Sequence, residues 1–96
     1  MKATLLKTNG EQKEIEITTF KDAQNFVGGI VQIRPLKEDP RKIVIMNEEG
    51  RALDLPDNPF FCAVHNNETI LGVYCGDLIL ADQKLFFNLP YDDKNI

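Results

Sequence analysis

Four residues in the C-terminal half of the chain have side chains that could bind a metal. Cys62 and His65 are three residues apart and would share one face of a helix, while Cys75 and Asp77 are two apart and would share one face of a strand. Together they could supply four zinc ligands. Structural zinc, however, prefers closely spaced cysteine pairs, and an aspartate beside a lone cysteine is a poor substitute. Two packed, reduced thiols are the simpler interpretation, because free cysteine is among the most buried residue types.

The same cysteines could also act as nucleophiles, with His65 as the activating base. That chemistry needs the thiol and the imidazole within hydrogen-bond reach, which sequence spacing does not guarantee. Carboxylate pairs also occur, at Glu14 with Glu16, Glu38 with Asp39, Glu48 with Glu49 and Asp92 with Asp93. Their strand, turn and tail contexts predict solvated surface rather than acid–base catalysis. We therefore predict no enzyme, no metal and no cofactor, and keep a Cys/His-dependent enzyme or metal site as an alternative.

The stretch FVGGIVQI, from Phe26 to Ile33, contains two consecutive glycines that resemble part of a phosphate-binding loop. A phosphate loop places its glycines after a strand and before a helix, so that helix amides point at the anion. Here the pattern is helix, glycines, strand. Gly28 and Gly29 are therefore interpreted as the end of a helix, where a glycine adopts the left-handed conformation without a steric penalty.

Length and charge exclude several classes of function. The 96 residues make one domain, which we assign to residues 1–90 with a frayed tail at 91–96. Eleven basic residues are scattered among fifteen acidic ones, for a net charge of -4, so no basic face for nucleic acid is expected. Mimicry of nucleic acid would need a denser run of carboxylates and is a minor hypothesis. The short apolar run at the N-terminus predicts neither a signal peptide nor a membrane span, and the expected location is cytoplasmic.

The elements that would position these residues follow from apolar periodicity and turn signals. The pattern predicts an α+β fold with a mainly antiparallel sheet of about five strands and one or two short helices on one face. A hairpin is expected around Thr8-Asn9-Gly10, and a helix capped by Thr18 or Thr19 follows it. A second short helix is expected to start near Asn58, with Pro59 at its first position. Strands are expected within residues 3–7, 14–17, 30–33, 43–46, 51–55 and 70–81.

Several stretches resemble a family of small uncharacterised domains found in bacteria, bacteriophages and mobile elements, a domain-of-unknown-function family with paired glycines after a short helix. They are an MKA start before a strand, AQNFVGGIVQI at 23–33, IVIMNEEGRALDLPDNP at 43–59 and ILGVYCGDLILA at 70–81. The chain departs from the family at Ala23-Gln24, where a leucine-glutamine pair is typical, and at Gln32, where an acidic residue is common. The resemblance implies a compact α+β domain in a phage or mobile-element setting, and implies no chemistry.

Function is expected to be binding by an accessory module. Neighbouring phenylalanines in Phe60-Phe61 and Phe86-Phe87 cannot both face a core, so Phe61 or Phe87 is expected in an exposed apolar patch with acidic flanks. Such a patch predicts a protein partner or self-association. The alternative is a small-molecule, nucleotide-like ligand bound in a concave site. It would lie where Gly72 and Gly76 interrupt a strand and let a ligand approach the backbone.

Overall fold

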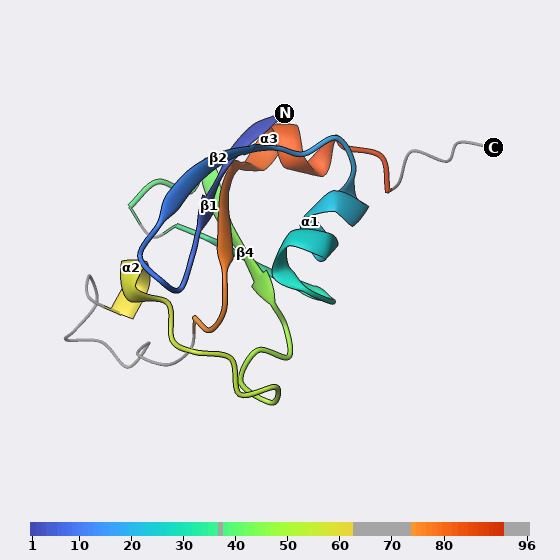
Figure 1. Cartoon of the computed structure of the whole chain (residues 1–96). Helices are drawn as coiled ribbons and strands as arrows, with labels where there is room; N and C mark the ends of the chain where they lie inside the picture. Colours follow the sequence, from blue (N-terminus) through green and yellow to red (C-terminus); the bar gives the residue numbers. More distant parts are fainter. Residues whose placement is uncertain (37, 63–73, 92–96) are drawn as a thin grey trace.

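The computed structural model describes residues 1–36, 38–62 and 74–91, and at residues 61 and 62 the backbone alone. Its centre is a five-stranded antiparallel sheet in the order β2-β1-β5-β4-β3 (Figure 1). The strands are β1 (Lys2–Leu6), β2 (Gln12–Glu16), β3 (Val31–Pro35), β4 (Lys42–Asn47) and β5 (Leu78–Asp82). The helices are α1 (Phe20–Val27), α2 (Pro59–Cys62) and α3 (Gln83–Phe87). The expected α+β class and antiparallel sheet are confirmed.

The N-terminal hairpin forms as its sequence predicts. β1 and β2 pair antiparallel, with Ala3 opposite Ile15, so that Ile15 is buried on the same face as Ala3. Gly10 in the connecting turn has a φ of 92°, in the left-handed region that glycine tolerates. Local turn chemistry and a period of two therefore suffice to define this part of the sheet.

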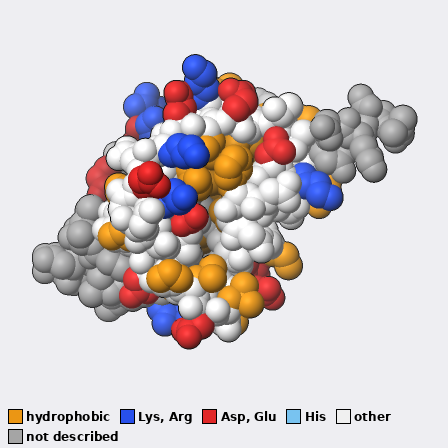
Figure 2. Space-filling model, in the orientation of Figure 1, with side chains coloured by type: hydrophobic (Ala, Val, Ile, Leu, Met, Phe, Trp, Pro, Cys, Tyr) orange, Lys and Arg blue, Asp and Glu red, His pale blue; other side chains and the backbone are white. Residues whose placement is uncertain are grey.

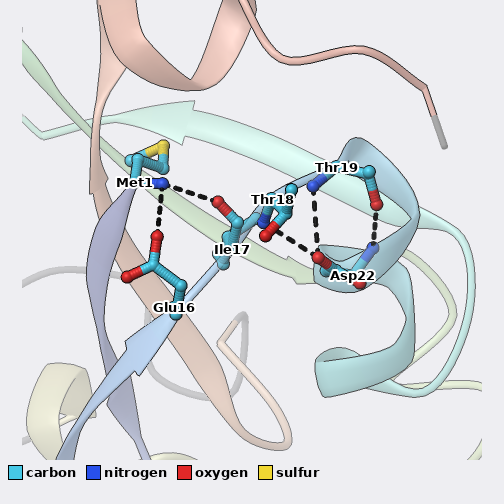
Figure 3. A network of polar contacts seen from close by, with 6 residues as sticks. All are labelled: Met1, Glu16, Ile17, Thr18, Thr19 and Asp22. Atoms are coloured by element: carbon cyan, nitrogen blue, oxygen red, sulfur yellow. Dashed lines mark hydrogen bonds and ion pairs between the residues drawn. The ribbon is translucent and has the colours of Figure 1, made fainter. Parts of the chain in front are cut away.

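α1 begins at a capping box formed by Thr19 and Asp22 (Figure 3). The Asp22 N–H donates to Thr19 Oγ1 at 3.2 Å, and the Thr19 N–H donates to Asp22 Oδ2 at 3.1 Å. These bonds satisfy amides that have no carbonyl partner at a helix start. The helix ends at Gly28, whose φ is 89°, and the interpretation of the paired glycines as a helix end is confirmed.

Both ends of the described chain lie close to the start of α1. The N–H groups of Phe20 and Lys21 donate to the carbonyls of Pro90 and Tyr91, each at 2.8 Å. The rings of Phe20 and Tyr91 stack with centroids 5.7 Å apart. The Met1 nitrogen donates to Glu16 Oε2 and to the Ile17 carbonyl, each at 2.8 Å, and both bonds are drawn in Figure 3. The first turn of α1 is thus held by residues far away in sequence.

The sheet carries apolar residues on both faces. Because side chains alternate along a strand, each central strand contributes to two clusters. The larger cluster packs under α1 and α3 and contains Ala3, Leu5, Ile15, Ile17, Ala23, Val27, Ile43, Ile45, Ile79, Ala81 and Phe86. The second contains Leu6, Val44, Met46 and Leu78, with Phe60 of α2 packed against it. The expectation that helices lie on one face only is therefore not confirmed, because α2 contacts the opposite face.

Two expected strands differ from those in the structure. Residues 51–55 form turns instead of a strand: the Leu53 N–H donates to the Glu49 carbonyl at 2.8 Å and the Leu55 N–H to the Gly50 carbonyl at 2.9 Å. These local bonds use the amides that a strand would offer to a neighbour. β5 begins only at Leu78, because Gly76 has a φ of 83°, which interrupts extended backbone. Residues 70–73 of the expected strand lie outside the described residues.

Candidate functional site

Of the four residues considered for metal or nucleophile chemistry, Cys75 and Asp77 have described side chains, and these two contact different partners. Cys75 is buried, with its Sγ 3.7 Å from Asp57 Oδ1, whereas Asp77 Oδ1 accepts a hydrogen bond from the Thr8 N–H at 3.0 Å. The side chain of Cys62 and the whole of His65 lie outside the described residues. Across residues 1–36, 38–62 and 74–91, no group of three His, Cys, Asp or Glu side chains could hold a metal ion.

Gly76 lies at a close approach, as expected for a strand glycine, but the approaching group is a side chain of the protein. A Cβ at this position would lie 2.8 Å from Leu55 Cδ1, which is shorter than any normal contact. Leu55 therefore uses the space that the glycine leaves. Gly72, the other glycine considered for ligand approach, lies outside the described residues.

An open hollow lies beside Gly28, at the C-terminal end of α1. Its volume is about 230 Å³. Its walls come from the turn between β1 and β2, from the end of α1, from the loop after β4 and from the turn before β5. The residues are Thr8, Phe26, Val27, Gly28, Leu55, Pro56, Gly76 and Asp77. Figure 2 shows hydrophobic side chains gathered at the lower end of the molecule, where Figure 1 shows the loop after β4. We call the hollow lined by the eight residues above the Gly28 hollow.

Phe26 is the aromatic residue that lines the hollow. Its position in α1 between Ala23 and Val27 would suit a core residue, but 38% of its surface is exposed, whereas Ala23 and Val27 are buried. Ala23 and Val27 are four positions apart, so these two lie on one helix face, and Phe26 falls at its flank. That offset is the sequence signal that could have placed Phe26 at the surface.

Two buried asparagines fix the loop that forms one wall of the hollow. At its start, Asn47 Nδ2 donates to the Val27 carbonyl at 3.1 Å, and Asn47 Oδ1 accepts from the Glu49 N–H at 2.8 Å. At its end, Asn58 Nδ2 donates to the carbonyls of Leu6 and Gly76, each at 2.9 Å. No buried nitrogen or oxygen of these two side chains lacks a hydrogen-bond partner, so their burial holds the loop in one geometry.

The loop beside the hollow is acidic. Its exposed carboxylates belong to Glu48, Glu49, Asp54 and Asp57, and its basic residue is Arg51. The loop that supplies Leu55 and Pro56 to the hollow is thus negatively charged, and Asp77 is the acidic residue among those that line the hollow. Elsewhere, an exposed ion pair joins Asp39 to Arg41, with Nε to Oδ1 at 3.0 Å, and its hydrogen bond lowers the pKa of Asp39.

Phe87, the exposed aromatic expected from the sequence, lies at the other end of β5. It is 57% exposed, while its neighbour Phe86 is 1% exposed and packs against Phe20. The expectation that one member of this pair faces solvent is confirmed. The side chain of Phe61 lies outside the described residues, so the same expectation for the pair Phe60-Phe61 is not tested. Phe87 and the Gly28 hollow are thus separate apolar surfaces.

Comparison with protein-family models, curated proteins and solved structures gives no match to the chain. Within the described residues, no helix has the length and apolar character needed to cross a membrane.

Proposed function

We propose that the chain is a non-catalytic binding module for a basic protein surface, and that one apolar side chain of the partner enters the Gly28 hollow. The single observation that carries the proposal is the hollow itself, which is lined by Phe26 of α1 and by Leu55 of the acidic loop after β4. A partly exposed aromatic wall with a charged rim is a common arrangement at protein interfaces. The burial of Cys75 supports the non-catalytic part, because reactive cysteines need an accessible thiol.

The size of the hollow favours a side chain over a nucleotide. At about 230 Å³ it lies below the range of roughly 300–1,000 Å³ that is usual for small-molecule pockets. A leucine or phenylalanine side chain can enter such a space and lose its contact with water there.

Charge determines which partner is favoured. The exposed carboxylates of Glu48, Glu49 and Asp54 belong to the loop that forms one wall of the hollow, and the chain has a net charge of -4. Complementary charge speeds encounter and rejects partners of like sign. The resemblance to phage and mobile-element domains gives a plausible setting, since host proteins that handle nucleic acid have basic surfaces.

Site-specific photocrosslinking tests the proposal. A benzoyl-phenylalanine is introduced at position 26 in one variant and at position 87 in another, and each is irradiated in a host lysate. We expect crosslinks from position 26 to a protein with a basic surface. That protein is then purified, and its affinity for the unlabelled chain is measured by calorimetry.

Charge reversal supplies the matched control. Glu48→Lys combined with Glu49→Lys is expected to weaken binding about tenfold or more, because both exposed carboxylates belong to the loop that supplies Leu55 and Pro56 to the hollow. Glu14→Lys combined with Glu38→Lys changes net charge equally at exposed positions outside that loop, and should have a much smaller effect. Crosslinking from position 87 alone, or equal effects of the two double variants, would contradict the proposal.

The alternative function, binding of a small molecule, is favoured by a second hollow. It has a volume of about 450 Å³, is open to solvent and is lined by Gln24, Asn25, Gly28, Gly29 and Ile30. The C-terminal end of α1 disfavours an anionic nucleotide there, so a neutral or cationic ligand is expected. Mass spectrometry of small molecules released from the protein purified from host lysate distinguishes the two functions.

A further inference from the structure

The two edges of the sheet differ in their protection against pairing. β2 forms one edge and exposes the charged side chains of Lys13, Glu14 and Glu16, which discourage the approach of another strand. β3 forms the other edge among the described strands. Its first three residues, Val31–Ile33, are uncharged and half-buried, and its charge is confined to Arg34.

The backbone of β3 presents hydrogen-bonding groups on its outer side. The Ile30 carbonyl accepts from the Glu48 N–H at 2.7 Å, and the Leu36 N–H donates to the Lys42 carbonyl at 3.0 Å. In an antiparallel ladder alternate residues point toward the partner, so the even-numbered residues from 30 to 36 face β4. The N–H and C=O groups of Val31 and Ile33 therefore point away from β4.

We propose that β3 pairs antiparallel with β3 of a second copy of this chain, about a twofold axis through Gln32. This register puts Val31 opposite Ile33 of the second copy. Each such pair exchanges two hydrogen bonds, so all outward groups of both residues are used. The two five-stranded sheets then join into one continuous sheet. The pairing is independent of the Gly28 hollow, and either proposal can fail without the other.

Sequence chemistry selects this register over its neighbour. An axis through Ile33 would put Val31 opposite Pro35, which has no N–H to donate. The axis through Gln32 puts Arg34 opposite Ile30, so no like charges meet, and the aliphatic stem of the arginine can cover an isoleucine that is 56% exposed.

At the axis itself, the two Gln32 side chains face each other. A glutamine amide carries both a donor and an acceptor, and so it can pair with its own copy. On the other face, Val31 and Ile33 already pack against the larger core cluster. In the dimer they meet their counterparts from the second copy, which removes further apolar surface from water. The edge is therefore self-complementary in hydrogen bonds, charge and apolar contact.

A charge-swap experiment tests the dimer by sedimentation velocity over a concentration series. Wild type is expected to show a concentration-dependent monomer–dimer equilibrium. Gln32→Lys and Gln32→Glu place like charges on the axis, and each alone should raise the dimer dissociation constant about tenfold. An equimolar mixture of the two variants should recover a heterodimer. Gln12→Lys, an exposed change on the β2 edge, is the matched control and should sediment as wild type does.

The recovery in the mixture guards against a trivial loss of folding, because an unfolded variant could not be rescued by its opposite charge. A wild type that stays monomeric at every concentration would overturn the proposal. So would a Gln32→Lys variant that dimerises as strongly as wild type, or a mixture that forms no heterodimer. Binding of β3 to an extended segment of another protein instead of its own copy would also overturn it.

Discussion

The side-chain amide of Asn47 donates a hydrogen bond of 3.1 Å to the carbonyl oxygen of Val27, which joins the end of β4 to the end of α1. The carbonyls in the last turn of a helix have no partner within the helix, and a buried asparagine satisfies one of them here. A Cβ at Gly29 would lie 3.2 Å from Asn47 Nδ2, so the glycine leaves room for the amide. The second glycine of the pair therefore has a packing role, while Gly28 supplies the left-handed turn.

Replacing Asn47 by aspartate should destabilise the protein. The carboxylate keeps an acceptor for the Glu49 N–H but cannot donate to the Val27 carbonyl. It would also place a charge at a buried position, because the native Asn47 is only 6% exposed. We expect a loss of about 1–3 kcal/mol in the free energy of unfolding, measured by urea denaturation at neutral pH. Asn25→Asp is the control, because it adds the same charge near the end of α1 at an exposed position. Equal losses in the two variants would show that charge, not the hydrogen bond, is responsible.

The contact between Gly76 and Leu55 can be tested with a double-mutant cycle. Gly76→Ala adds a Cβ that would lie 2.8 Å from Leu55 Cδ1, at a residue with a φ of 83°. The backbone term alone costs about 1 kcal/mol, and the clash adds to it. In the Leu55→Ala background the clash disappears, so the same glycine substitution should cost less. The free energy of unfolding of all four proteins gives the coupling.

Gly10→Ala separates the two terms of that cost. Gly10 has a φ of 92°, close to that of Gly76, but a Cβ there would meet nothing within 4 Å. This variant should lose only the backbone term, with or without Leu55→Ala. If Gly76→Ala proves no more destabilising than Gly10→Ala, the close packing of Leu55 against Gly76 is wrong.

The parts of the fold that could be predicted are those determined by neighbouring residues. The hairpin around Asn9-Gly10 and the helix between Thr19 and Gly28 depend on turn and cap chemistry within a few positions. The order of the sheet could not be predicted, because β5 inserts between β1 and β4 through contacts distant in sequence. In the loop after β4, apolar alternation at Leu53 and Leu55 suggested a strand. Instead, the N–H groups of Leu53 and Leu55 bond locally to the carbonyls of Glu49 and Gly50.

The Gly28 hollow was not predictable for the same reason. Phe26 and Leu55 belong to elements that are distant in sequence. Both line the hollow because the hydrogen bonds of Asn47 and Asn58 hold the loop after β4 in place. Sequence spacing also suggested that Cys75 and Asp77 share a strand face. The left-handed conformation of Gly76 between them interrupts the alternation, and the two side chains contact different partners.

Adjacent Phe86 and Phe87 should differ sharply when replaced by alanine. Phe86 is 1% exposed and its ring centroid lies 5.5 Å from that of Phe20. Phe86→Ala should therefore cost about 3–5 kcal/mol, the usual range for a buried phenylalanine. Phe87 is 57% exposed, and Phe87→Ala should change stability by less than about 1 kcal/mol, including its edge contact with Phe86. Thermal or urea unfolding distinguishes them, and a large loss at Phe87 would mean that this ring is covered in solution.

Asn58 is the polar residue on which the turn before β5 most depends. It is 0% exposed, donates to the carbonyls of Leu6 and Gly76, and accepts from the Phe60 N–H at 3.0 Å. It therefore ties β1, α2 and the turn before β5 together. Leucine has the same branched arrangement of heavy atoms but no polar atoms, and its methyl groups are larger, so a substitution at this position removes the hydrogen bonds and adds some overpacking.

Asn58→Leu should leave these three backbone groups without their partner and lower the free energy of unfolding by more than about 3 kcal/mol. Hydrogen exchange at the Phe60 amide should also accelerate, because its acceptor is gone. Asn88→Leu is the matched control: its side chain is exposed, and the backbone N–H that bonds at the end of α3 is retained. It should change stability by less than about 0.5 kcal/mol. If Asn58→Leu is as stable as the control, the buried amide does not hold the loop, and the geometry of the Gly28 hollow must be maintained by apolar packing alone.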